Sequence, residues 1–455
     1  MIKSIGGQLG GLIKDKGLKG DLIRGGAGSI AIKLASTVLG LLTGVFVARA
    51  LGPEHYGIYA YVMALVSLLS LPALFGLPSL IVRETAKAQA HEQWGLMRGL
   101  WRWSSTFTGG LAVFIAIVAF FAALLVAGRF SAEQLQTMFW GVILVPLMTL
   151  GNLRGAALRG LHKVLQGQLP ESVVRPVLFL FLIGLLAWLK VDLTAPHAMA
   201  MNALASLFAF ILGAWLLWIA RPEGLRQKPV SVVHGQEWLK SALPLALTSA
   251  LSMVNHHADI IMIGWFSSAT DVGIYRVATS GAALVVFGLT TINMVVGPYY
   301  AKFHARKEKQ QIQKLATNSA RVVIAMTLPV VIAFLFFGEP LIGFIFGQEY
   351  LSAHLSLAII SVGQLMNASF GSVGLLLVMI GHERETTKGV AVATLSNVVL
   401  NAVLIPIYGI EGAAFATAFT LLTWNVLLWI AVARHLGIDT LAVPLAKRLH
   451  IGKKW

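Results

Sequence analysis

The sequence contains no cysteine among its 455 residues. Disulfide bonds, thiolate metal sites and palmitoylated cysteines are therefore excluded. Charged residues are also scarce, at 12% of the chain, whereas soluble globular domains carry about 25%. A chain with so little charge is a poor candidate for a set of soluble domains.

Several catalytic motifs are absent from the sequence as well. No Gly-x-x-x-x-Gly-Lys phosphate loop occurs, which excludes a pump with its own ATP-driven motor. His91 and Glu92 begin a zinc-protease pattern, but Gly95 stands where the second histidine would be. We expect no cofactor, no metal site and no catalytic residue.

Long apolar runs fill the sequence instead. Apolar residues make up 57% of the chain, and the mean hydropathy is +0.78. A run of about 18 apolar residues is long enough to cross the hydrocarbon core of a bilayer. Such runs lie at approximately 27–50, 56–78, 104–127, 137–157, 169–189, 197–220, 241–264, 272–297, 319–338, 354–380, 387–405 and 410–433. The sequence therefore predicts an all-α membrane protein with about 12 transmembrane helices.

The formal net charge of +16 comes from basic residues that gather in the loops between these runs. If the N-terminus is cytoplasmic, nearly all of them fall in cytoplasmic segments, as the positive-inside rule requires. The exceptions on the outside are Arg49, Arg129, Lys190 and Arg276, and Lys33 and Arg175 fall within spans. This distribution predicts cytoplasmic N- and C-termini and argues against nucleic acid as a partner.

Three short motifs recur in the same order in the two halves of the chain. They are Gly57-Ile58-Tyr59 and Gly273-Ile274-Tyr275, Gly160-Leu161-His162 and Gly381-His382-Glu383, and Leu217-Trp218-Ile219-Ala220 and Leu428-Trp429-Ile430-Ala431. Their nearly constant spacing predicts two pseudo-symmetric six-helix bundles with a cavity between them. Because one chain supplies both bundles, we expect a monomer.

The repeat sets the predicted domain boundaries. They are a cytoplasmic N-terminal segment at 1–26, an N-lobe of six helices at 27–220, a cytoplasmic linker at 221–240, a C-lobe of six helices at 241–434 and a cytoplasmic tail at 435–455.

Residues 47–59, Val-Ala-Arg-Ala-Leu-Gly-Pro-Glu-His-Tyr-Gly-Ile-Tyr, carry a family resemblance. They resemble the end of the first helix and the first outside turn of Wzx-type polysaccharide flippases, in the multidrug/oligosaccharidyl-lipid/polysaccharide exporter superfamily. The resemblance extends more loosely over the whole chain. Lipid II flippases of the superfamily fit less well, because the arginines of their first helix would fall at Thr37 and Thr43.

The resemblance implies a function and a location. The function is to flip a polyprenyl-diphosphate-linked oligosaccharide from the cytoplasmic to the periplasmic leaflet by alternating access, coupled to an ion. The cargo would be an O-antigen, capsule or exopolysaccharide repeat, and the location the bacterial inner membrane. Membrane lipids and the polymerase and chain-length proteins of the same pathway are the other expected partners.

A sugar diphosphate cannot cross hydrocarbon unaided, because burying its charged groups is too costly. The flippase must offer a wet cleft with arginine or lysine for the diphosphate. The candidate cavity charges are Arg175, Lys33, Arg276, Arg49 and Arg83. Their plainer alternatives are pairing with Glu171 for Arg175, snorkelling for Lys33, interface anchoring for Arg276 and Arg49, and a local ion pair with Glu84 for Arg83.

The densest polar cluster, Asn255-His256-His257-Ala258-Asp259, lies within the span 241–264. His256 and Asp259 are three residues apart and share a helix face. Such a pair can exchange a proton between pH 5 and 8, which makes both residues candidates for ion coupling. The alternatives are an ion pair of Asp259 with Arg276 or Arg49, and a sodium site.

Two other functions remain open from the sequence. A proton- or sodium-coupled drug exporter of the same superfamily would need acidic residues for cationic cargo, whereas the charges within these spans are mostly cationic. A membrane-embedded polysaccharide polymerase or ligase usually displays a long outside loop with catalytic residues. The longest outside loop here, 338–353, holds only Glu339 and Glu349 as charged residues. The sequence therefore favours a transporter over an enzyme.

Overall fold

The structure, a computed structural model, describes residues 18–227 and 229–442, and these residues form helices and no strand. The expected all-α fold is thereby confirmed. Inside a bilayer a helix satisfies the backbone hydrogen bonds within its own segment, so long apolar runs adopt this form. Parts of the predicted N-terminal segment and tail, 1–17 and 443–455, lie outside the described residues.

Nine helices in this described part of the chain are long and apolar enough to cross a membrane. Every predicted span lies largely in helix, but the span 56–78 crosses the turn at Phe75 and Gly76, and the span 354–380 is broken at Gly371 and Ser372. Helices α2 (Leu18–Leu74) and α15 (Glu383–Leu436) each hold two spans, joined at Gly52 (φ 73°) and Gly409 (φ 58°). The span at 241–264 lies in α10 (Gly235–Phe266), where the polar residues around Asp259 lower the hydropathy. The chain is thus a multi-pass membrane protein.

The first of two compact units takes in residues up to Thr43 and Val66–Ser249. Besides parts of α2 and α10, it contains α3 (Leu77–Ala90), α4 (Trp94–Leu125), η1 (Ala127–Arg129), α5 (Ala132–Gly160), α6 (Val164–Leu169), the π-helical turn η2 (Pro170–Val174), α7 (Arg175–Trp188), α8 (Ala195–Ala220) and α9 (Glu223–Arg226). Helix α5 packs against α3, α4 and α8 and forms the centre of this unit.

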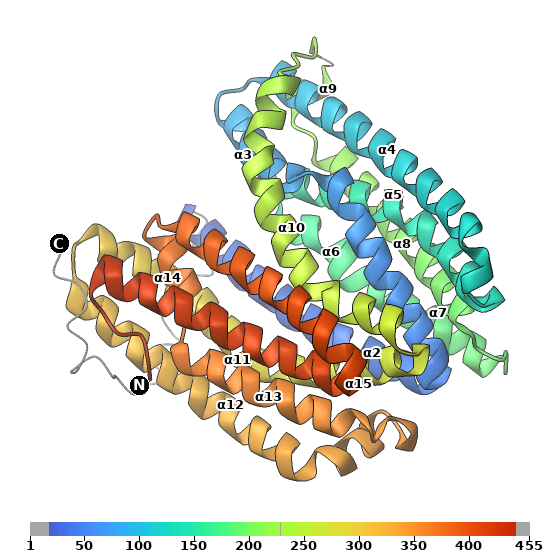
Figure 1. Cartoon of the computed structure of the whole chain (residues 1–455). Helices are drawn as coiled ribbons and strands as arrows, with labels where there is room; N and C mark the ends of the chain where they lie inside the picture. The colour runs from blue at the N-terminus through green and yellow to red at the C-terminus, as the bar shows by residue number, and fades with distance from the viewer. Residues whose placement is uncertain (1–17, 228, 443–455) are drawn as a thin grey trace. The chain divides into compact units, whose positions relative to one another are not determined.

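The second unit takes in Gly44–Leu65 and the chain from Ala250 onward. It contains the middle of α2, the end of α10, α11 (Ala269–Ala305), α12 (Lys309–Ile345), η3 (Gln348–Tyr350), α13 (Ala353–Phe370), α14 (Val373–Met379) and α15. Helix α13 packs against α11, α12 and α15 (Figure 1). The predicted lobe boundaries rest on membrane topology, which helix contacts do not define, and they stay a prediction.

Candidate functional site

Asp259 is a buried carboxylate of the second unit that accepts hydrogen bonds from two other helices. Tyr275 of α11 donates its hydroxyl to Asp259 Oδ2 at 2.8 Å, and Thr417 of α15 donates to the same oxygen at 2.5 Å. Asn401 of α15 donates its amide to Oδ1 at 2.6 Å and to the side chain of Asn397 at 3.1 Å. Three helices therefore converge on one carboxylate, which is 9% exposed.

Asp259 forms no ion pair with a basic side chain among the described residues. In the described part of the chain, no lysine, arginine or histidine nitrogen lies within 4.0 Å of its carboxylate, so neither of the expected ion pairs with Arg276 or Arg49 is present. A buried carboxylate is costly unless a cation or a proton compensates it. Asn401 Oδ1, a buried oxygen with no hydrogen-bond partner among the described residues, adds a ligand for a hard cation. The arrangement can hold a proton or a small cation.

His256 was expected to share a proton with Asp259. Its side chain is exposed, whereas Asp259 is buried. Its ring lies edge-on to that of His257, with the centroids 5.5 Å apart. Among the described residues, the hydrogen bonds of Asp259 come from Tyr275, Thr417 and Asn401 and not from His256. Proton sharing within this pair therefore stays a prediction.

Arg276, a candidate cavity charge, lies half-buried on α11 beside Tyr56 of α2. The Tyr56 hydroxyl forms side-chain hydrogen bonds with Arg276 and with Ser280. The Ser280 hydroxyl also donates to the carbonyl of Arg276 at 2.8 Å. A buried tyrosine thus holds this guanidinium within the second unit, on the same helix as Tyr275.

Arg49, a second candidate, connects α2 to the end of α12. Its Nε donates to the Ile345 carbonyl at 2.8 Å, and its Nη2 donates to the Phe344 carbonyl. The last carbonyls of a helix have no partner within that helix, so Arg49 caps α12. Tyr350 of η3, which follows α12, forms a second hydrogen bond to α2 by donating its hydroxyl to the Ala48 carbonyl at 2.8 Å.

Two glycines of the repeated Gly-Ile-Tyr motif meet beside these contacts, in what we call the glycine crossing (Gly57 and Gly273). A Cβ on Gly57 would overlap the carbonyl of Ala269, and a Cβ on Gly273 would overlap the carbonyl of Pro53. The two contacts are reciprocal, as the pseudo-symmetry of the repeats requires. So close a backbone approach needs a residue without a side chain on both helices.

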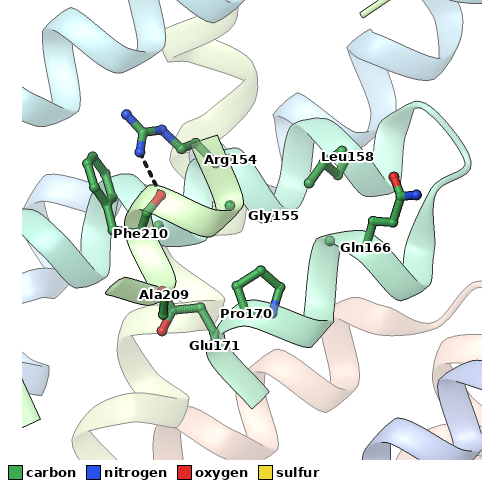
Figure 2. Close-up of a pocket in the computed structure, with 11 residues that line it drawn as sticks. Arg154, Gly155, Leu158, Gln166, Pro170, Glu171, Ala209 and Phe210 are labelled. Carbon is green, nitrogen blue, oxygen red and sulfur yellow. Dashed lines mark hydrogen bonds between the residues drawn. The ribbon is translucent and has the colours of Figure 1, made fainter. Parts of the chain in front are cut away.

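The first unit contains a small recess that residues of α5, α6, η2 and α8 line (Figure 2). Arg154 of α5 donates Nη1 to the Phe210 carbonyl at 3.1 Å, and its guanidinium lies 3.5 Å from the centre of the Phe210 ring. Glycines line much of the recess: Gly151, Gly155, Gly167 and Gly213. Small residues on α5 and α8 leave the space in which a planar cation can stack on an aromatic ring.

Glu171 lies in the π-helical turn at the lower edge of this recess (Figure 2). Its Oε2 is 3.5 Å from Nη1 of Arg175, a candidate cavity charge, so the pairing that their spacing allows is present. Both side chains are about a quarter exposed. A π-helical turn often marks a functional position, because the extra residue redirects the side chains that follow.

The two remaining cavity candidates lie apart from these clusters. Lys33 is exposed on α2. Arg83 of α3 forms an ion pair with its neighbour Glu84 at 2.9 Å, and its side chain is 57% exposed. Their role in a substrate cavity stays a prediction.

The sequence indicated some of these residues better than others. Asn397 and Asn401 are spaced four apart in an apolar run, which places two amides on one helix face. Thr417 carries no such signal, because a threonine in a membrane helix usually bonds its own backbone. Arg154 lies near the end of a predicted span, where a basic residue is equally typical of the following loop.

Comparisons with known proteins agree with this architecture. A family model described as "Polysaccharide biosynthesis protein" matches residues 46–355, more than half of the chain. The chain is similar to the probable low-salt glycan biosynthesis flippase Agl15 of Haloferax volcanii, with 21% identity over 377 residues that cover 82% of this chain and 76% of that protein.

Two solved structures share the fold. A lipid II flippase, MurJ, in an inward closed conformation aligns with a TM-score of 0.70 and 16% identity over 89% of this chain and 87% of that chain. An inward-facing multidrug resistance transporter of the MATE family aligns with a TM-score of 0.68 and 13% identity over 88% of this chain and 96% of that chain. At these identities the likeness concerns the fold alone, which is that of a two-lobe helical transporter.

Proposed function

The chain belongs to the family of polysaccharide biosynthesis proteins, and from this premise we propose that it is a flippase for a lipid-linked glycan. The observation that carries the proposal is the similarity to a glycan biosynthesis flippase over 82% of the chain. Proteins named as flippases are transporters, so the chain is a transporter rather than an enzyme. The fold alone does not select the cargo, because a multidrug transporter shares it.

The physical task of such a flippase agrees with the polar groups inside the units. The lipid tail can stay in the bilayer, while the sugar and diphosphate need a polar path. Arg154 has a hydrogen-bond partner for only one of its nitrogens among the described residues, so its other N–H groups are available to phosphate oxygens. The cavity volume of the recess is only about 10 Å³, far below the usual 300–1,000 Å³ of a ligand site, so a headgroup requires the surrounding helices to move apart.

Ion coupling is proposed to act through Asp259. Binding of a proton or a sodium ion would neutralise the carboxylate. A ligand that binds one conformation better than another shifts the balance between them. Movement of α10 against α11 and α15 would change how well the site holds its ion. Alternating access would follow if α2 and α11 also separate at the glycine crossing.

The finer proposals follow the resemblance of residues 47–59 to Wzx-type flippases. The cargo is a polyprenyl-diphosphate-linked repeat of an O-antigen, a capsule or an exopolysaccharide. The protein acts as a monomer in a bacterial inner membrane, with both termini in the cytoplasm, where the basic loops are predicted to lie. It delivers its cargo to the polymerase and chain-length proteins of the pathway.

The test is mass spectrometry of polyprenyl-diphosphate intermediates in the native host after deletion of the gene. The initial sugar transferases are reduced at the same time to limit toxicity. We expect one complete lipid-linked repeat to accumulate and to stay shielded from periplasmic enzymes until the gene is restored. Accumulation of long lipid-linked polymer or of unligated glycan would instead assign the chain to a later step.

A drug exporter gives a different result in the same strain. The lipid-linked intermediates would stay at their normal level, and the cells would become more sensitive to cationic drugs. That outcome would reject the flippase.

A further inference from the structure

A short extended segment after α15, residues 437–442, folds back onto the second unit. Helix α15 ends at Leu436, and Gly437 turns the chain with φ 59°. The side chains of Ile438, Asp439, Thr440 and Ala442 are then between 1% and 5% exposed. A segment that follows the last helix is buried here as deeply as a helix core, and we call it strap 2.

Strap 2 is clamped to α12 through its backbone. Gln313 donates its amide to the Asp439 carbonyl and accepts the Asp439 N–H on Oε1 at 2.8 Å. Two turns further along α12, Arg321 donates Nε to the Ala442 carbonyl at 2.9 Å. The Asp439 carboxylate accepts Trp429 Nε1 of α15 at 2.9 Å. The clamp therefore joins the third and sixth long helices of the second repeat.

Strap 2 also supplies a donor where a helix is interrupted. The chain breaks between α13 and α14 at Gly371, which has φ 69°. The last carbonyls of α13 have no partner in the helix beyond this break. The Ala442 N–H donates to one of them, that of Ser369, at 3.2 Å. An interrupted membrane helix needs such outside partners, because lipid offers none.

The first unit carries a segment at the corresponding position after its sixth long helix, residues 229–234, which we call strap 1. Unlike strap 2 it is largely exposed, with Val230 at 87% and Val233 at 51%. It lies on α4, the third long helix of that repeat. Arg98 of α4 donates Nη1 to the Pro229 carbonyl at 2.7 Å, and Val232 N–H donates to the Gly95 carbonyl at 3.0 Å. Gly99 leaves no room for a Cβ beneath the Val232 carbonyl, so the strap rests on the helix backbone.

We propose that straps 1 and 2 are paired braces that hold the third helix of each repeat to the rest of its unit. The third helix of each repeat then stays attached to its unit throughout the transport cycle. Gln313 and Arg321 act as positioning residues in strap 2, and Arg98 acts in the same way in strap 1. The proposal rests on the proposed flippase function for its role in transport, but the bracing itself does not depend on the cargo.

Hydrogen exchange of the purified full chain tests the bracing without any substrate. Replacement of Gln313 by alanine removes the two hydrogen bonds to the Asp439 backbone, and we expect roughly five- to tenfold faster exchange in peptides that cover 369–373 and 438–442. Gln311→Ala is the matched control, because Gln311 is exposed on the same helix. If Q313A does not fold, Arg321→Gln replaces it, since that side chain is exposed. Equal exchange in Q313A and Q311A, or in R321Q and Q311A, would overturn the brace.

A reversible crosslink then tests whether strap 2 must open. Because the chain has no cysteine, the pair Ser369→Cys and Ala442→Cys can be joined by a disulfide or a short reducible bis-thiol reagent without side reactions. A brace predicts that the crosslinked protein restores glycan delivery in the deletion strain as well as the reduced protein does. If crosslinking stops delivery and a reductant restores it, the strap is a moving latch and the proposal is wrong. If the reduced protein also fails to deliver glycan, the flippase function fails, while the exchange data still decide on the brace.

Discussion

Replacement of Asp259 by asparagine changes the shape of the site very little and its hydrogen bonding a great deal. The carboxylate now accepts from Asn401 on one oxygen and from Tyr275 and Thr417 on the other. An asparagine must put its NH₂ group on one of these sides. Asn401 cannot turn its amide in response without losing its bond to Asn397, so the NH₂ group faces the two hydroxyls.

The hydrogen-bond part of the cost follows from counting protons, and removal of an unpaired buried charge offsets part of it. Both hydroxyls must turn their protons away from position 259. The Tyr275 proton can go to Thr417 Oγ1, which lies 3.3 Å away, and the Thr417 proton can then go only to a carbonyl of its own helix. Two hydrogen bonds to a carboxylate are thereby replaced by weaker neutral ones, which costs about 1–3 kcal/mol. Tyr275→Phe removes one donor and leaves the carboxylate in place, and the loss of a hydrogen bond to a charged group should cost about 1.5–3 kcal/mol.

Transport provides the second measurement of the same variant. Asparagine is neutral at every ordinary pH, so D259N mimics a permanently occupied ion site. We expect flipping of a lipid-linked glycan in proteoliposomes to become insensitive to an imposed sodium or proton gradient. Unfolding in detergent gives the stability change. Gradient stimulation equal to that of the wild type, together with unchanged stability, would show that Asp259 neither binds the ion nor depends on its donors.

Three further predictions use other parts of the structure. Gly57→Ala should lower stability by about 1–3 kcal/mol, because its Cβ overlaps backbone at the glycine crossing. Gly40→Ala is the control and should not lower stability, because no atom lies within 4 Å of its Cβ. Thermal unfolding measures both variants. Arg154→Lys keeps the charge but loses the planar stacking on an aromatic ring, which should cost about 0.5–2 kcal/mol in denaturant unfolding. Burial lowers the pKa of His382, as do the charges of His435 and another histidine. The contribution of neutral His382 to the free energy of unfolding should therefore be fully present above the ordinary histidine pKa of 6.5 and decrease as the pH falls below it. His382→Gln should weaken this pH dependence of stability between about pH 7.5 and 5.5.

The helices could be predicted from the sequence because a membrane imposes one rule on every apolar run. Span length is a local property, and the predicted segments lie largely in helices. The span in α10 is the instructive case, because its hydropathy is reduced by the residues that matter most. Asp259 was found as a candidate for the same reason, since a carboxylate in an apolar run is conspicuous.

The partners of Asp259 could not be predicted, because they depend on how the helices are rotated. An apolar run surrounded by lipid and protein has no strong polar face, so the sequence does not fix which side of α15 meets α10. Thr417 and Tyr275 become part of the site only when that rotation is known. Strap 2 was missed for a different reason: residues 437–442 are not periodic, and their burial depends on Gln313, far away in the sequence.

The reciprocal contacts at the glycine crossing are those expected of a chain that arose by duplication and fusion of a six-helix ancestor. In an ancestor with a single six-helix chain, Gly57 and Gly273 would be one residue, and the reciprocal contacts would place that residue against its own copy on the two-fold axis of a dimer. Any substitution at that position would have disturbed the dimer interface at two places, so selection would have retained glycine. Duplication and fusion relax this condition, because each copy can now change alone. A directed library at the two positions should therefore tolerate a small residue at one glycine sooner than at both.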